Sequence, residues 1–255
     1  MFITVAVIFI VLATFLLIMY NMYVDYVARR ESDLRMMVNH ARNIITDTEE
    51  LLLNQNQLPF SKVLVLILRY RILNALKKLK QDPHAKHIDE KIAEQMRMIK
   101  ETQNNYKEDL AFRPPENDTI AVNQLREIRR LRKLIYTELR AGTPVDPVSC
   151  QKEDRRLQLL VLKVNISNLI QRTLDLKRMH QVGSCRQLVE KGLEVIQHSP
   201  IKDNWLDDKA MTLSQILADL EKEVKEKNRR QLEEQVEDEE NKKELDELFG
   251  DKKKW

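Results

Sequence analysis

The chain has 255 residues and a formal net charge of +3, the difference between 43 basic and 40 acidic side chains. This balance gives no overall field that favours nucleic acid, and two cysteines are too few for a disulfide framework. Four glycines and seven prolines leave few helix breaks and argue against glycine-rich loops that hold phosphates. We therefore expect an all-α protein.

The first segment is uniformly apolar. From Phe2 to Met19 there is no charged side chain, and this length matches the ~30 Å hydrocarbon core of a bilayer. In lipid, every backbone amide must be bonded within the segment, so a spanning segment must be a helix. Tyr20, Tyr23 and Tyr26 follow at helical spacing, where their rings can lie among lipid headgroups. Residues 1–24 are therefore predicted to be a single transmembrane anchor.

The alternative interpretation of this segment is a cleaved secretory signal. No basic residue precedes the apolar run, the run is longer than a signal core, and no small-x-small cleavage site follows it. Arg29, Arg30, Arg35 and Arg42 follow closely, so the positive-inside rule places the C-terminal body in the cytoplasm. The predicted localisation is a membrane crossed once, which in a bacterium would be the inner membrane.

Proline, glycine and the spacing of apolar residues predict the other helices. The first helix should continue to about Asn54, because no breaker occurs before Pro59. It carries an amphipathic stripe after the apolar run. Residues 142–150 contain two prolines and are predicted to be a loop. Further helices are expected at about residues 59–81, 84–110, 119–141, 151–181 and 184–198, and from 207 onward.

The apolar faces of these helices need partners. Residues 63–68 are apolar all round, which predicts a helix buried on several sides. The seam along 159–176 fits a coiled coil or an intramolecular bundle equally well, and we favour the bundle. We expect an antiparallel helical bundle or a short helical array. Homo-oligomerisation through the juxtamembrane helix is left open.

The predicted domain organisation has four parts. They are an anchor at 1–24, a juxtamembrane helix and first hairpin at 25–112, a second helical region at 113–224, and a charged helical or disordered tail at 225–255. A shift of 117 residues lays 72–83 on 189–200, with helix and proline turn matched. Helix periodicity alone produces some of these matches, so a duplication is left open.

No motif in the chain carries recognisable chemistry. His84 and His87 are three residues apart, but there is no CxxC, HExxH or Glu-x-x-His pair that would supply metal ligands. Neither a Gly-x-Ser-x-Gly nucleophile turn nor a nucleotide fingerprint occurs. We therefore expect no metal, no cofactor and no enzymatic activity.

Basic residues crowd the fourth predicted helix. They are Arg126, Arg129, Arg130, Arg132, Lys133 and Arg140. Such a cluster can contact the phosphates of anionic lipid or of nucleic acid. Aromatic residues make up only 5% of the chain, which disfavours a stacking platform but leaves nucleic acid open. A solvated face balanced by neighbouring acids is the alternative.

The C-terminal segment is acidic and then ends in a few apolar residues. The acidic stretch cannot bury enough surface to fold alone. A short apolar motif at the end of a polar tether is typical of a peptide that docks in a partner's groove. The candidate docking residues are Leu245, Leu248, Phe249 and Trp255. A tail that only aids solubility is the alternative.

These features predict a membrane-anchored, non-catalytic helical scaffold or interaction protein. It would present a helical body and a C-terminal docking tail to an unidentified cytoplasmic protein. The alternative function is a membrane-associated binder of nucleic acid or anionic lipid through basic helix faces.

Overall fold

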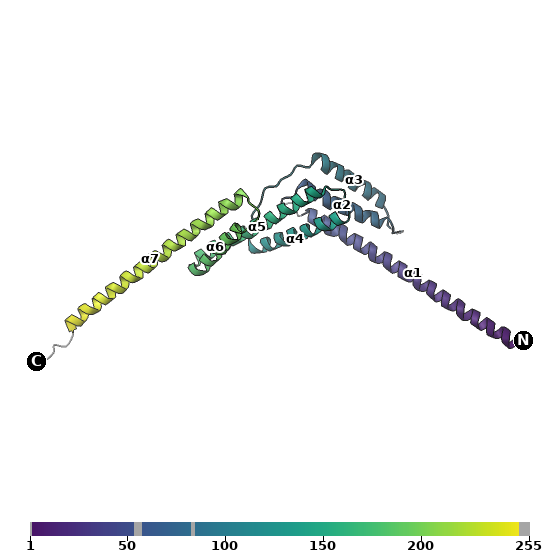
Figure 1. The fold of residues 1–255 in the computed structure, drawn as a ribbon, viewed down its shortest axis with the longest axis horizontal. Helices are drawn as coiled ribbons and strands as arrows, with labels where there is room; N and C mark the ends of the chain where they lie inside the picture. The colour runs from purple at the N-terminus through teal and green to yellow at the C-terminus, as the bar shows by residue number, and fades with distance from the viewer. Residues whose placement is uncertain (1, 54–57, 83–84, 250–255) are drawn as a thin grey trace. The chain divides into compact units, whose positions relative to one another are not determined.

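The fold was obtained as a computed structural model, which describes residues 2–53, 58–82 and 85–249, with side chains described between residues 12 and 243 (Figure 1). The described residues form seven helices and no strand, so the all-α prediction is confirmed. The helices are α1 (Phe2–Leu53), α2 (Lys62–Leu79), α3 (Ile88–Asn105), α4 (Asp118–Arg140), α5 (Pro147–Arg178), α6 (Val182–Gln197) and α7 (Asn204–Phe249).

The start of α5 corrects the predicted loop at 142–150. Pro147 occupies the first helical position, where its missing N–H costs no hydrogen bond. The Asp146 side chain accepts hydrogen bonds from the backbone N–H of Val148 (3.3 Å) and of Ser149 (2.9 Å). This side chain therefore caps the helix, and α5 begins four residues earlier than predicted.

The end of α5 also differs from the prediction of a helix to about residue 181, because α5 ends at Arg178. His180 adopts the left-handed conformation with φ of 56°, and the Gln181 N–H donates to the Leu176 carbonyl at 3.0 Å. This bond spans five residues, as in a Schellman end, so histidine takes the position that glycine usually fills. Gly183 instead lies in the first turn of α6.

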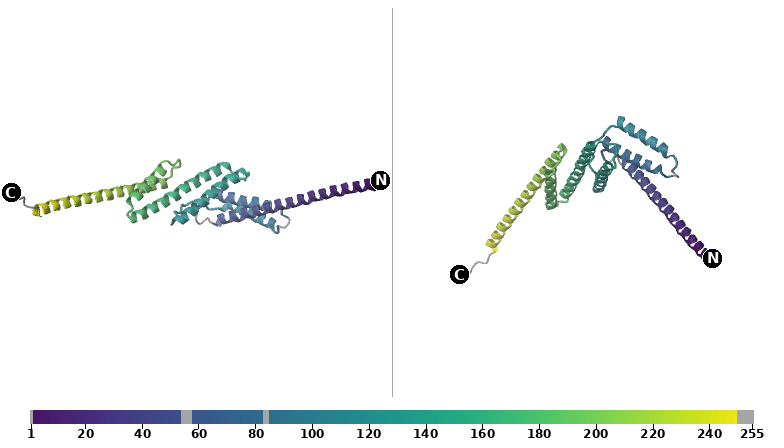
Figure 2. Two further views of the ribbon diagram at one scale, coloured as in Figure 1. Left: turned by 90° about the horizontal axis from the view of Figure 1, so that it is seen from below. Right: turned by 45° about the vertical axis from the view of Figure 1, so that its right-hand side comes forward.

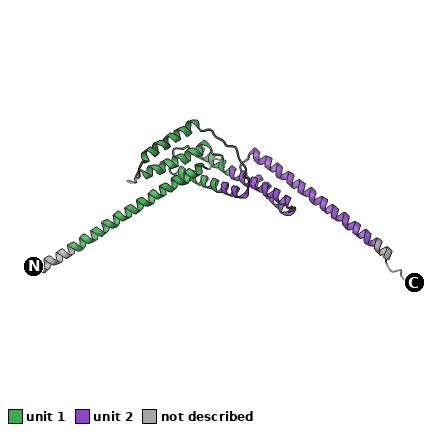
Figure 3. Ribbon diagram, turned by 180° about the vertical axis from the view of Figure 1, so that it is seen from behind, with its two compact units in different colours: residues 1–113, 126–158 green, residues 114–125, 159–255 purple. Residues whose placement is uncertain are grey.

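The chain divides into two compact units, which Figure 3 shows in different colours. Unit 1 holds residues 1–113 and 126–158, and unit 2 holds 114–125 and 159–255. In unit 1, α2 packs against both α1 and α3. The stretch 63–68 of α2 is buried or half-buried throughout, as its apolar sequence predicts. Val38 and Ala41 of α1 pack on Ile72 and Leu76 of α2.

In unit 2, α6 and the first part of α7 form a hairpin, and the two views of Figure 2 show them alongside each other. Its core joins α5, α6 and α7 through the buried Ile166, Val189 and Leu213. The paired stretches at 72–83 and 189–200 begin in α2 and in α6, and each of these helices packs against the helix that follows it. The helical-bundle prediction is supported in each unit.

The structure does not support the predicted transmembrane, single-pass assignment. Among the residues that it describes, no helix has a stretch long and apolar enough to cross a bilayer. Residues 1–11 of the predicted anchor lie outside the described side chains. From Leu12 to Val27, the large apolar side chains of α1 are exposed.

Replacing Gly192 of α6 with leucine is expected to lower the free energy of unfolding of unit 2 by about 1–3 kcal/mol. A Cβ atom on Gly192 would lie 2.9 Å from Cδ2 of Leu169 and 3.0 Å from Cδ1 of Leu213, so a larger side chain forces these two leucine side chains to move. Urea denaturation followed by far-ultraviolet circular dichroism measures the loss. The matched control is Gly183→Leu, because a Cβ there meets nothing within 4 Å. Equal losses in both variants would contradict the steric explanation.

Candidate functional site

Five of the six predicted phosphate-contacting residues lie on one exposed side of α4: Arg126, Arg129, Arg130, Lys133 and Arg140. At 3.6 residues per turn, they fall within about 100° of the helix circumference. The opposite side of α4 carries Ile128, Leu131 and Ile135, which are buried in the core. Because packing holds that side inward, these five cations, here called the basic face, point to solvent.

The basic face is only partly neutralised by neighbouring acids. Arg130 forms an exposed ion pair with Asp47 of α1, with Nη2 and Oδ2 3.2 Å apart. The other four cations of the basic face form no ion pair with a described residue. Like charges spaced along one helix face repel one another, and a polyanionic surface relieves that repulsion. The basic face is therefore suited to contact a row of phosphates.

Arg132, the sixth predicted contact, lies apart from the basic face. Its Nε donates to Oδ1 of the buried Asp154 of α5 at 2.7 Å, and Nη2 donates to Oδ2 at 3.3 Å. Asp154 also accepts hydrogen bonds from the Tyr136 hydroxyl and the Gln158 amide. Burial alone would raise the pKa of the Asp154 carboxyl, but these hydrogen bonds hold that pKa below its ordinary value. Arg132 thus ties α4 to α5.

Acidification below about pH 4 is expected to destabilise unit 1 through Asp154. A carboxyl whose pKa is depressed on folding contributes stability above its unfolded-state pKa, and this contribution is lost as the pH falls through the folded-state pKa. Urea midpoints measured between pH 6 and about pH 2 test this. The Asp154→Asn variant lacks the titrating group, so its midpoint should depend less on pH. An identical pH dependence in both proteins would contradict the prediction.

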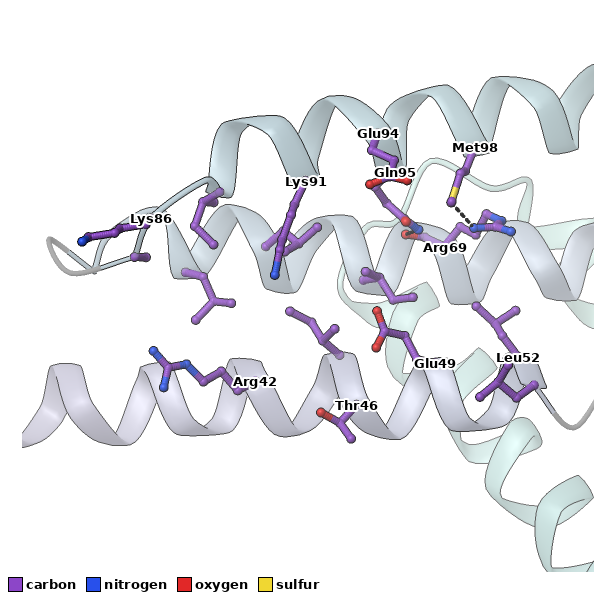
Figure 4. Close-up of a pocket in the computed structure, with 17 residues that line it drawn as sticks. Arg42, Thr46, Glu49, Leu52, Arg69, Lys86, Lys91, Glu94, Gln95 and Met98 are labelled. Atoms are coloured by element: carbon purple, nitrogen blue, oxygen red, sulfur yellow. Dashed lines mark hydrogen bonds between the residues drawn. The ribbon is translucent and has the colours of Figure 1, made fainter.

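A second surface was not predicted from the sequence. A groove of about 970 Å³ lies in unit 1 between α1 and α3, with α2 as its floor (Figure 4). Ile72, Leu76 and Leu79 of α2 line its base. Figure 4 shows Arg42 of α1 and Lys91 of α3 pointing into the space between these helices. We call this feature the α1–α3 groove.

The charged lining of the α1–α3 groove is mainly basic. Four cations and two carboxylates line it: Arg42, Arg69, Lys86, Lys91, Glu49 and Glu94. Lys86 and Lys91 are exposed and form no ion pair with a described residue. The charged residues surround the apolar base, so the groove offers an apolar strip with a basic margin.

Arg69 brings an incompletely bonded guanidinium to the groove. Its Nη1 donates to the thioether Sδ of Met98 at 2.9 Å, and a thioether is a weak acceptor. Its Nε is buried and has no hydrogen-bond partner among the described residues. A buried donor without an acceptor costs roughly 1–3 kcal/mol. An oxygen-bearing ligand that reaches Arg69 would remove this cost.

The candidate docking residues Leu245, Leu248, Phe249 and Trp255 lie outside the described side chains. The backbone of α7 is helical through Phe249. Residues 225–243 of this helix are all exposed, which fits a charged tail that packs on none of the described residues outside it.

No family model matches this chain, and no curated protein or solved structure resembles it. The roles of the basic face, the groove and the tail are therefore argued from their geometry and charge.

The two cysteines and the histidines at 84 and 87 were the candidate metal and thiol groups in the sequence. Among the described residues, no group of three or more His, Cys, Asp or Glu side chains is arranged to hold a metal, and His84 lies outside them. Cys150 and Cys185 are both buried. Burial raises the pKa of both thiols, which keeps them protonated and weakly nucleophilic. They serve as small apolar side chains of the two cores.

Proposed function

We propose that this protein is a membrane-anchored, non-catalytic helical scaffold. The N-terminal part of α1 holds it in the bilayer. The rest of the chain presents a helical body and a C-terminal docking tail to proteins in the cytoplasm.

The observation that carries the anchor is the exposure of apolar side chains around the circumference of α1 at residues 15–18. Phe15, Leu16, Leu17 and Ile18 point in directions about 100° apart, yet each exposes 58–61% of its surface. A helix that is apolar on every side is typical of a lipid environment. Further along the same helix, Ala41 is only 1% exposed, because there α1 packs on α2.

Charge supports the cytoplasmic placement of the body. Arg29, Arg30 and Arg35 follow the proposed anchor, residues 1–24, within about three turns and are exposed. Basic residues next to a span favour the cytoplasmic side. The scaffold role is supported by the kinds of surface that the body carries, namely a basic helix face, a groove and a long exposed helix.

Extraction of membranes with alkaline carbonate tests the anchor. The full chain is expected to remain with the bilayer. A Leu12→Asp, Leu16→Asp variant should be released, because each charge near the middle of a span costs about 2.5–3.5 kcal/mol. The matched control places the same two charges on exposed apolar residues of α1 beyond the run, as Met36→Asp, Leu53→Asp, and should stay bound. Release of the full chain would overturn the proposal.

A crosslinking pull-down from intact membranes tests the docking tail. The full chain is compared with a chain that ends at Lys243, which lacks all four candidate docking residues. Loss of specific partners in the shorter chain is expected. Identical partners for both chains would place the interaction on the helical body instead.

A second candidate function is the binding of anionic lipid headgroups by the basic face. It is favoured by the gathering of five exposed cations on one side of α4, opposite its buried side. An anchor that keeps the body near a bilayer would bring these cations to a dense array of phosphates.

A further inference from the structure

The α1–α3 groove has the length of a short helix. Its lining runs from Arg42 to Leu53 on α1 and from Ile88 to Met98 on α3. At 1.5 Å per residue, each wall is roughly 15–16 Å long, which is about three helical turns. A helix laid between α1 and α3 would complete a four-helix arrangement around the apolar base of the groove.

The lining of the groove combines apolar and polar residues in the way that suits an amphipathic peptide. Eight of its 17 lining residues are charged or polar: Arg42, Thr46, Glu49, Arg69, Lys86, Lys91, Glu94 and Gln95. Sites for small apolar molecules are lined mostly by apolar side chains, whereas an amphipathic helix needs an apolar strip with polar margins. Because cations outnumber carboxylates in the lining of the groove, a helix with acidic flanks should bind there more favourably than one with basic flanks.

The chain itself contains such a helix at the end of α7. Leu245, Leu248 and Phe249 stand at positions i, i+3 and i+4, so a helix places them on one face. Glu244, Asp246 and Glu247 lie between and beside them. The sequence of segment 244–249 is therefore that of an amphipathic helix with acidic flanks, and carboxylates are the kind of acceptor that Arg69 lacks.

The exposed part of α7 extends beyond the core of unit 2. Residues 225–243 are exposed along their whole length. Val224 lies near the last residues of α7 that pack in the core. If α7 is straight, Leu245 lies roughly 30 Å further along it. The segment is thereby held away from the core of its own unit and is free to meet a second molecule.

We propose that the α1–α3 groove of one copy binds the C-terminal segment 244–249 of a second copy. The apolar face of the segment covers Ile72, Leu76 and Leu79, and its carboxylates meet Lys86, Lys91 and Arg69. This rests on the proposed docking role of the tail and names the partner of that tail.

A photocrosslinker in place of Phe249 tests the contact. The full chain carrying p-benzoylphenylalanine at position 249 is reconstituted in phosphatidylcholine nanodiscs that hold two copies. One copy is isotopically heavy, so mass spectrometry distinguishes adducts between copies from those within one copy. We expect adducts between copies at groove residues such as Met98 and Leu52. The control crosslinker at Leu232, an exposed residue of α7, should give no groove adduct.

Reversing charges on the groove and then on the segment distinguishes specific docking from a loss of fold, because a second reversal restores docking but cannot repair a misfolded groove. Lys86→Glu, Lys91→Glu changes two exposed residues of the groove margin and should reduce the groove adduct at least tenfold. Glu244→Lys, Glu247→Lys in the partner copy should restore it. Adducts outside the groove, adducts within one copy only, or a yield unaffected by Lys86→Glu, Lys91→Glu would overturn the proposal. Adducts from position 249 to a different membrane or cytoplasmic protein would also overturn it, while leaving the docking role of the tail intact.

Discussion

Glu138→Ala is expected to lower the free energy of unfolding of unit 1 by about 3 kcal/mol. Glu138 of α4 is buried and accepts a hydrogen bond from Nη1 of Arg71 on α2 at 2.6 Å. Its second oxygen accepts from the Thr143 hydroxyl at 3.0 Å. Without the carboxylate, the half-buried guanidinium of Arg71, whose Nε already lacks a partner among the described residues, loses its counter-charge. Urea denaturation of the purified protein measures the change.

Two variants show whether burial is the cause of this effect. Glu138→Gln keeps an acceptor for Thr143 but not the charge, so its loss of stability should be smaller than that of Glu138→Ala. Glu190→Ala removes an exposed carboxylate that pairs with Arg186 within α6, and solvent screening should leave stability unchanged. If Glu138→Ala and Glu190→Ala had the same effect, the buried ion pair would contribute nothing to the fold.

Charge reversal on the basic face is expected to weaken binding to anionic vesicles about 100-fold. Each cation near an anionic surface contributes about 1 kcal/mol, so Arg126→Glu, Arg129→Glu, Lys133→Glu removes about 3 kcal/mol. These side chains are exposed and form no ion pair with a described residue, so the fold should persist. The measurement is co-flotation of protein in phosphatidylcholine nanodiscs with phosphatidylglycerol vesicles, and binding should fall as salt is raised.

The matched control for this variant changes net charge by the same amount elsewhere. Lys222→Glu, Lys225→Glu, Lys227→Glu alters three exposed residues of α7 that do not share one face. It should retain vesicle binding. Equal loss in both variants would show that net charge, rather than the basic face, governs attachment. Binding of an oligonucleotide instead of vesicles would favour nucleic acid as the ligand.

Helix positions were predictable where the sequence carries a local signal. The absence of a breaker before Pro59 predicted a first helix that continues to about Asn54, and α1 is helical through Leu53, the last described residue before 54–57. The start of α5 was missed because Asp146 and Pro147 were taken as loop residues, although together they form a strong cap. The end of α5 depends on His180 at positive φ, which no pattern in the sequence indicates.

The functional surfaces were predictable only in part. Angular spacing along α4 could have separated Arg132 from the basic face, since it falls beside Ile128 and Ile135 on the helix circumference. Its link to Asp154, 22 residues away, could not have been read from spacing. The α1–α3 groove arises from how three helices pack, and the sequence gives no sign that residues as distant as Arg42 and Lys91 line one groove.

α1 is one unbroken helix from its apolar part to the wall of the α1–α3 groove. No glycine or proline occurs between Phe2 and Leu53, so this helix has none of the residues at which helices usually bend. Its last three turns also form one wall of the groove. A tilt of about 10° at Val27 would move Leu53, roughly 39 Å further along, by about 7 Å. The apolar part of α1 and one wall of the groove therefore belong to a single unbroken helix, so a change of tilt in the first is expected to shift the second.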